Sequence, residues 1–353
     1  MKIAILNDTH CGIRNASQIF LDNARDFYEN IFFPECEKRG IKQILHLGDY
    51  YDHRKYVNFK VLNHNRYHFL NKIREKGMRM DIIPGNHDTY FKNTNHLNSL
   101  KECLGHYMNE VHIVMEPKVI EYGSLKMALL PWINQENYEK SMNFVNNCKA
   151  DWLGGHLELS GFELMRGITN QHGMDAMSFS RFEKVLTGHF HCSSQRDNIW
   201  YLGAQMEFFW SDAHDPKYFH VLDTETREME KIRNTYTLFE KIVYNDEKIR
   251  YNEYDTSKLD KKFVKVVVVN KSDTFEFDRF IDRIQMQNIY DLKIAENFSE
   301  FVGSNIADET LEVDDTPKLM DDYIDAVDTD LDKFTIKKQM RELMNQAQAM
   351  ETV

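Results

Sequence analysis

The sequence predicts an α/β fold built in layers, followed by a small α+β unit and a helical tail. From Met1 to about Phe219, short apolar runs alternate with longer amphipathic stretches, as strands alternate with helices in layered α/β domains. A β-branched run, an amphipathic stretch and an acidic segment then follow in turn. We expect a main domain at 1–245, a small unit at 255–299, an acidic linker at 300–332 and an amphipathic helix at 333–353.

The expected strands of the main domain are apolar runs of strand length. They cover residues 3–6, 43–47, 80–83, 111–115, 125–130, 152–153, 184–186, 218–223 and 238–244. Helices are expected where apolar residues recur every three or four positions, at 17–39, 58–76, 97–104 and 136–149. In the small unit, 262–269 predicts a strand and 275–287 an amphipathic helix. The tail has helical periodicity through Ile336, Met340, Leu343, Met344 and Ala347, which favours docking on a partner protein over packing on this chain.

The composition is that of a globular protein without a membrane span. No apolar run approaches the ~20 residues that a spanning helix needs. The net charge of −12 argues at first against a nucleic-acid partner, but twelve acidic residues and one lysine between Glu300 and Asp332 account for −11 of it. About −1 remains for everything else, so charge excludes no partner. No signal peptide is recognised, and the five scattered cysteines are expected to be reduced thiols in a cytoplasm.

Side chains that can bind metal follow five of the expected strands. They are Asp8 and His10, then Asp49, Asn86, His156, and finally His189 and His191. Ligands of α/β sheets bind at the edge formed by the carboxyl ends of the strands, so we expect these side chains to meet there. Asp8 and His10 share one side if the backbone is extended, and His189 and His191 repeat this spacing. A lone histidine is more often structural, but five motifs in order indicate a metal site.

Seven such ligands are too many for one metal ion and suit two. Asp49 is the candidate to bridge two ions ~3.5–4 Å apart. Imidazole, carboxylate and amide ligands together favour Mn²⁺, with Fe²⁺ or Zn²⁺ possible, whereas Mg²⁺ prefers oxygen ligands. Two divalent cations, two carboxylates and one hydroxide leave about +1, which matches the single negative charge of a phosphodiester. We expect His87 to face the phosphate and assist the leaving oxygen, and Asp88 to orient a neighbour.

Basic residues that follow the first three motifs are candidates for contacting the phosphates of a polymer. They are Arg14, Arg54, Lys55, Lys60, Arg66 and Lys92. An ordinary solvated charge is an equally good interpretation of each one taken alone.

The ordered motifs Asp-x-His, Gly-Asp-x-x-Asp, Gly-Asn-His-Asp, Gly-His and Gly-His-x-His resemble those of the calcineurin-like metallophosphoesterases. Together with the small unit, the acidic segment and the terminal helix, they make the chain similar to the SbcD-type nucleases of double-strand-break repair, phage versions included. The resemblance implies a layered metallophosphoesterase sandwich with a DNA-binding cap domain. It also implies a two-manganese DNA exonuclease and endonuclease that acts in recombination and repair in the host cell cytoplasm.

The resemblance further implies how ligands and partners are assigned. One metal falls to Asp8, His10, Asp49 and His191, and the other to Asp49, Asn86, His156 and His189. His87 becomes the catalytic histidine. A homodimer is expected through helices at 58–76 and 95–104, and an SbcC-type coiled-coil ATPase is expected to bind the terminal helix.

One position departs from the family pattern. Many relatives carry a second catalytic histidine where this chain has Asp52, and His53 comes next, so both are candidate catalytic residues. Two other functions stay open. A phosphoprotein phosphatase is one, because Arg54 follows the Gly-Asp-x-x-Asp motif one residue late. A non-catalytic scaffold is the other, although such proteins lose ligands and all seven positions are filled here.

Overall fold

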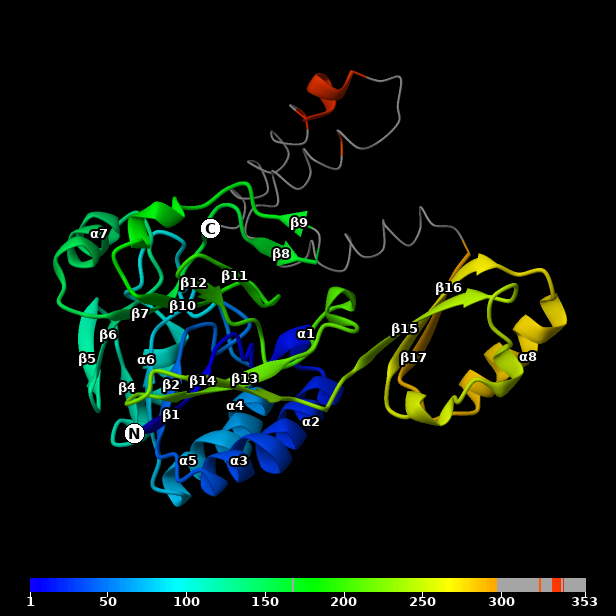
Figure 1. Cartoon of the computed structure of the whole chain (residues 1–353), viewed down its shortest axis with the longest axis horizontal. Coiled ribbons are helices and arrows are strands. Elements are labelled where there is room, and N and C mark those ends of the chain that lie inside the picture. The colour runs from blue at the N-terminus through cyan, green and yellow to red at the C-terminus, as the bar shows by residue number, and fades with distance from the viewer. Residues whose placement is uncertain (167, 297–323, 325–331, 338, 340–353) are drawn as a thin grey trace.

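The structure is a computed structural model that describes residues 1–166, 168–296, 324, 332–337 and 339. Two six-stranded sheets pack against each other, and helices cover their outer faces (Figure 1). A small three-stranded sheet with one helix stands beside this body (Figure 1). The predicted layered α/β fold is therefore confirmed.

Most inner strands of both sheets are parallel, and antiparallel pairs close one edge of the first sheet and both edges of the second. The first sheet has the order β14, β13, β1, β2, β3, β4, with bounds Met229–Arg233, Tyr218–Asp223, Lys2–Leu6, Gln43–His46, Arg79–Ile82 and Val111–Ile113. The second has the order β11, β12, β10, β7, β6, β5, with bounds Ser194–Arg196, Ile199–Tyr201, Lys184–Gly188, Trp152–His156, Leu125–Leu130 and Lys118–Tyr122. A separate hairpin joins β8 (Glu163–Met165) to β9 (Ile168–Thr169). Of these strands, the sequence did not predict β5, β11 and β14 at the edges of the two sheets, β12 next to β11, or β8 and β9 of the separate hairpin.

Strand β1 shows why an unbroken apolar run fits the middle of this fold. Ile3 and Ile5 enter the core between the two sheets, whereas Ala4 and Leu6 enter the core beneath the helices. Successive side chains of a strand point to opposite faces, so a strand covered on both sides must be apolar at every position. This burial fixes the register of β1 and hence the position of the polar residues that follow it.

Helices flank the sheets on both outer faces (Figure 1). They are α1 (Ile13–Ala16), α2 (Gln18–Phe27), α3 (Phe33–Lys38), α4 (Phe59–Asn65), α5 (Asn71–Glu75), α6 (Ser99–Leu104) and α7 (Tyr138–Asn147). The predicted helix 17–39 is α2 and α3 joined by a π-helical segment at Tyr28–Phe32. The helix 58–76 likewise joins α4 and α5 through Arg66–Leu70.

The small unit is a parallel sheet in the order β15, β16, β17 with α8 on one face. Its bounds are Phe239–Asn245, Phe263–Asn270, Asp291–Ala295 and, for α8, Thr274–Gln285. The Asp273 side chain caps α8 by accepting from the N–H groups of Phe275 and Glu276. The boundary placed at 245 left β15 in the main domain, but β15 pairs with β16. An apolar run does not reveal which sheet it joins, because its pairing partner lies elsewhere in the chain.

Aromatic contacts attach the small unit to the body. The Phe20 ring of α2 stacks on Phe263 at 6.0 Å between centroids, and Phe239 lies 5.0 Å from Trp210. Of the terminal segment, residues 333–337 and 339 are helical, while most of the predicted linker 300–332 and the rest of the predicted helix 333–353 lie outside the described residues. In the described part of the chain, no helix has the length and apolar character needed to cross a membrane.

Candidate metal centre

The ends of five strands bring all seven predicted metal ligands to one edge of the sandwich. Six of the ligands lie in the loops after β1, β2 and β3 of the first sheet and β10 of the second, and His156 is the last residue of β7. The seven ligands are Asp8, His10, Asp49, Asn86, His156, His189 and His191. The prediction that these side chains meet at the carboxyl ends of the strands agrees with their positions in the structure.

Four of these residues have a left-handed backbone. Their φ angles are 46° at Asp8, 41° at His10, 54° at Asp49 and 90° at His189. Residues other than glycine rarely adopt this conformation, and each instance costs roughly 1–3 kcal/mol. The expectation that Asp8 and His10 share a side through an extended backbone is therefore wrong. Such conformations persist where surrounding structure enforces them, and they cluster at functional sites.

Asp8, His10 and His191 form the first group that is able to hold a metal ion. The Nε2 atoms of His10 and His191 are 3.0 Å apart. His10 Nδ1 lies 3.3 Å from a carboxylate oxygen of Asp52, so the ring proton belongs on Nδ1. The Nε2 lone pair of His10 then faces His191, a contact that a cation between the two rings would stabilise.

Asp49, His156 and His189 form the second group, and Asn86 joins them. His156 Nδ1 donates to the Leu47 carbonyl at 2.8 Å, which leaves the Nε2 lone pair facing Asn86 Oδ1 at 3.0 Å and Asp49 Oδ2 at 3.2 Å. His189 Nδ1 is 3.0 Å from the same Asn86 oxygen. Electron-pair donors that converge in this way fit a divalent cation.

The Asp49 carboxylate connects the two groups. Its Oδ2 atom is 3.2 Å from His156 Nε2 and 3.7 Å from His10 Nε2. Its other oxygen accepts the backbone N–H of His87 at 2.8 Å, which fixes the orientation of the carboxylate. One oxygen therefore faces both groups, as a bridging ligand must.

The electrostatics of the site suit cations. Burial raises the pKa of Asp8. At Asp49 burial also acts to raise the pKa, but the charges of His156, His87 and His10 and the hydrogen bond to His156 together outweigh it and hold this pKa well below the usual range. Burial lowers the pKa of His10, but the hydrogen bond to Asp52 and the nearby carboxylates outweigh this and raise it to about 10. Burial also lowers the pKa of His156, but Asp49, Asp8 and the Leu47 carbonyl together outweigh it and raise this pKa to about 9. The site thus favours positive charge at the positions where two groups of ligands converge.

His87 stands beside the first group, and its ring lies 4.8 Å from that of His10. Its Nδ1 donates to the Asp52 carbonyl at 2.6 Å, so Nε2 is the atom left to meet a substrate. The side chain is half-buried, whereas His10 and Asp49 are buried.

Asp52 and His53 occupy different environments. The Asp52 carboxylate is buried and contacts His10, whereas the His53 ring is 39% exposed and stacks on Tyr56 at 4.5 Å between centroids. His53 Nε2 lies 3.7 Å from Asp52. From this position Asp52 can orient His10 and His87, and it is less well placed to contact a substrate.

Asp88 and a glycine hold the loops after β2 and β3 together. The Asp88 carboxylate accepts from the N–H groups of Tyr50, Tyr51 and Gly85 at 2.9 to 3.2 Å. A Cβ at Gly85 would lie 2.1 Å from Asp49 Oδ1, so only glycine fits there.

A buried cation supports the backbone of His191. Lys217 Nζ donates to the His191 carbonyl at 3.0 Å and to the carboxylates of Asp212 and Asp215 at 2.5 and 3.1 Å. Asp212 also accepts from the N–H groups of Phe208 and Phe209. The sequence analysis did not single out Lys217, because its partners become visible only in three dimensions.

Several predicted phosphate-contacting residues make bonds within the chain. Arg14 donates to the Phe208 carbonyl, Arg54 to the Thr89 carbonyl and Lys60 to the Ala16 carbonyl. Lys55, Arg66 and Lys92 are exposed side chains. The first three therefore have structural roles whether or not they also meet a phosphate.

Trp132 is a site residue that the sequence analysis missed. It follows β6, and its ring lies 5.4 Å from the His189 ring and 5.9 Å from the His156 ring. A signal was present, since the other site residues also directly follow strands. It was overlooked because tryptophan is not a metal ligand.

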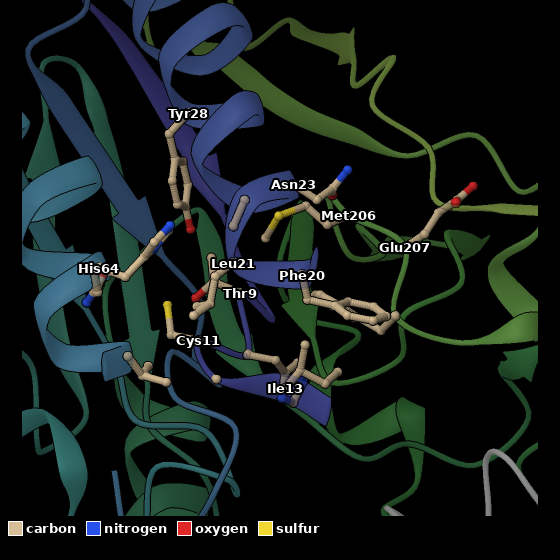
Figure 2. A pocket seen from close by; sticks show the side chains of 16 residues that line it. Thr9, Cys11, Ile13, Phe20, Leu21, Asn23, Tyr28, His64, Met206 and Glu207 are labelled. Atoms are coloured by element: carbon tan, nitrogen blue, oxygen red, sulfur yellow. The ribbon is translucent and has the colours of Figure 1, made fainter. Parts of the chain in front are cut away.

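A small pocket has His10 among its lining residues and is walled by Phe20, Tyr28 and His64 (Figure 2). Its volume of about 20 Å³ is room for about one water molecule. This pocket is therefore too small for a substrate.

The sequence profile of the calcineurin-like phosphoesterase family matches residues 1–193. The chain belongs to this family. The match ends just after His191, so it includes every residue of the candidate metal centre. As a calcineurin-like phosphoesterase the chain is a metal-dependent hydrolase of phosphate esters, in agreement with the resemblance stated from the motifs.

Two relatives resemble the chain over most of its length. Exonuclease subunit 1 of Enterobacteria phage T4 is 28% identical over 356 residues, which cover 98% of this chain and 99% of the relative. SbcD of the nuclease SbcCD from Staphylococcus epidermidis is 24% identical over 263 residues, which cover 65% of this chain and 67% of the relative.

Solved structures also resemble the chain. An archaeal phosphodiesterase is 17% identical with a TM-score of 0.34, covering 66% of this chain and 100% of its own. A purple acid phosphatase from yellow lupin seeds is 11% identical with a TM-score of 0.36, covering 65% of this chain and 52% of its own.

Proposed function

We propose that this protein is a two-metal DNA nuclease that hydrolyses phosphodiester bonds by exonuclease and endonuclease cleavage in recombination and repair. One observation carries the proposal: a single Asp49 oxygen faces two converging groups of ligands. The similarity to T4 exonuclease subunit 1 along nearly the whole chain supports DNA as the substrate.

Two sets of side chains would hold the metals. Asp8, His10, Asp49 and His191 make up one set, and Asp49, Asn86, His156 and His189 the other. This mixture of imidazole, carboxylate and amide ligands suits Mn²⁺, with Fe²⁺ or Zn²⁺ next. When bound, the metals supply positive charge for the phosphate and make water more acidic.

His87 would contact the phosphate through Nε2. Its Nδ1 proton is held by the Asp52 carbonyl, and its backbone N–H is held by Asp49, so the ring has a fixed direction. From there Nε2 can hydrogen-bond a phosphate oxygen or pass a proton to the leaving sugar oxygen. Asp52 would act through His10 and His87 as a positioning residue.

A comparison of substrates tests the proposed function. The purified protein is loaded with Mn²⁺, its metal content is measured, and its turnover of a DNA duplex is compared with that of a phosphopeptide. We expect DNA cleavage that needs the metal and that His87→Ala abolishes, with the metal content retained. Turnover of the phosphopeptide alone would indicate a phosphatase instead, and full DNA cleavage by His87→Ala would overturn the role of His87.

We also propose two assemblies. The chain forms a homodimer through 58–76 and 95–104, and an SbcC-type coiled-coil ATPase binds the segment 333–353. Phe59 and Tyr67, 87% and 58% exposed on the first of these helices, support the dimer. Deletion of the residues after Asp332 should abolish co-elution with the ATPase while metal binding is kept. Co-elution of the truncated protein would contradict this docking.

A further inference from the structure

A pocket of about 600 Å³ opens next to the second ligand group, since His156 of that group lines it. Its walls include Trp132 in the loop after β6, Tyr138 at the start of α7, His156 at the end of β7 and Glu158 just after that strand. Ligand pockets commonly measure 300–1,000 Å³, so a nucleoside-sized group has room here. The pocket shares His156 with the candidate metal centre, and a group bound at the metals can therefore extend into it.

Trp132 forms a fixed wall between this pocket and the metal centre. The backbone N–H of Trp132 donates to the Pro84 carbonyl at 2.9 Å. The backbone carbonyl of Trp132 accepts from the side-chain amides of Asn95 at 2.8 Å and Asn137 at 3.0 Å. Asn134 ties the same loop to Asn95 at 2.8 Å. An indole whose backbone is anchored at three points offers a preformed flat surface, which favours stacking of a planar group.

The charge of the pocket excludes a second phosphate. Its described lining residues include Glu136, Glu139 and Glu158 and no lysine or arginine. Carboxylates repel a phosphate but accept hydrogen bonds from exocyclic amino groups, as they do from the amino group of cytosine. The lining thus suits a neutral, planar, amino-bearing ring attached to a phosphate that is bound at the metals.

We propose that this pocket receives the base of one nucleotide next to the scissile phosphate, stacked on Trp132. This inference rests on the proposed function and deepens it. A base inside a duplex would have to leave its stack at a cost of a few kcal/mol, whereas a terminal or unpaired base does not. The pocket therefore selects frayed ends and single strands, and adenine, guanine and cytosine bind better than thymine.

Binding of a mononucleotide tests the pocket separately from catalysis. Calorimetry compares deoxyadenosine monophosphate with deoxyribose phosphate on the Mn²⁺-loaded protein. We expect the wild type to prefer the nucleotide by on the order of 10- to 100-fold, and Trp132→Ala to lose this preference with its metal content unchanged. Trp132→Phe should keep part of it. Trp200→Phe is the matched control, because Trp200 on β12 contacts Lys184 rather than the pocket, and it should keep all of it.

Cleavage provides the second readout. A single-stranded oligonucleotide is compared with the same strand carrying an abasic residue at the cleaved position. The ratio of the two rates should fall in Trp132→Ala and persist in Trp200→Phe. If the wild type does not prefer the nucleotide, or if Trp132→Ala keeps this preference, the proposal of a base-binding pocket is overturned. A nucleotide preference without any DNA cleavage overturns the proposed function and leaves the pocket standing.

Discussion

The metal centre and the small unit of β15–β17 and α8 are built in opposite ways. The ligands of the centre come from the ends of five separate strands, and four of the seven ligands have a left-handed backbone. The small unit is continuous in sequence, and its core is formed by apolar side chains such as Tyr244, Val266 and Ile284. The difference teaches that a unit continuous in sequence can be stabilised by burying its own apolar side chains. The metal centre instead brings strained polar residues together, and this arrangement persists only because the surrounding fold is stable.

The two regions meet through the segment 206–210. Phe208 packs on the rings of His10 and His191, while the neighbouring Glu207 accepts from the N–H groups of Leu238 and Phe239 where β15 begins. The two regions should therefore respond differently to substitution. Changes in the centre should affect hydrolysis, changes in the small unit should affect stability, and changes in the junction should reveal any coupling.

The largest effect is expected at Gly85. In Gly85→Ala the new Cβ would lie 2.1 Å from Asp49 Oδ1, so the carboxylate that joins both ligand groups must move. Hydrolysis of a phosphodiester should fall by on the order of 10⁴-fold or more, with loss of bound metal. Gly105→Ala is the matched control, since a Cβ there meets nothing within 4 Å. Normal metal content and rate in Gly85→Ala would contradict the bridging position of Asp49.

Lys217 should have the next largest effect, and it acts on stability. Lys217→Met leaves the Asp212 carboxylate buried without its cation, whereas Asp215 keeps its ion pair with Arg166. Breaking a buried ion pair in this way typically costs about 3–5 kcal/mol. Denaturant titration should show this loss in the free energy of unfolding. The exposed Lys248→Met serves as control and should change it by less than about 0.5 kcal/mol. A small loss for Lys217→Met would mean that the centre is not held by this buried cluster.

Glu207 should give the junction a pH dependence. Burial raises the pKa of its carboxyl to about 7 from the ordinary 4.5, although the N–H groups of Phe239 and Leu238 oppose the shift. The folded protein therefore holds a proton that the unfolded chain releases. This stabilisation is complete below pH 4.5 and is lost as the pH rises through 7. The total loss in the free energy of unfolding is up to about 3 kcal/mol.

The free energy of unfolding, measured from pH 4 to pH 8, checks this pH dependence. Subtraction of the Glu207→Gln curve from the wild-type curve isolates it from other groups that titrate in the same range, such as Asp88, whose pKa burial raises to about 6. Identical curves for the two proteins would show that Glu207 does not titrate at the junction.

The smallest effect is expected inside the small unit. Ile284 is fully buried on α8, and Ile284→Val removes one methylene at a cost of about 0.5–1.5 kcal/mol. Hydrolysis of a small phosphodiester and metal content should stay at wild-type values. A fall in either one would show that the two regions are coupled more closely than their construction suggests.

Much of the site was predictable because each motif is short and follows a strand of recognisable pattern. Asp8 and His10 follow Ile3–Leu6, and His189 and His191 follow the run at 184–186, so the shared edge of parallel strands was enough to bring them together. The backbone of Asp8 and His10 was not predictable, because a left-handed φ at a non-glycine residue is imposed by its surroundings. Lys217 and Trp132 escaped for a related reason, since their roles depend on neighbours far away in sequence.

By itself, the sequence determined the layered α/β class, the amphipathic helix that became α8, and the identity of the seven candidate ligands. These depend on periodicity and on residue type, which act over a few residues. Only the tertiary structure decided that β15 joins the small sheet, that one Asp49 oxygen faces both groups, and that Asp52 contacts His10. Such pairings arise when segments distant in sequence pack together, and the free energy that selects them comes from the burial of the whole fold.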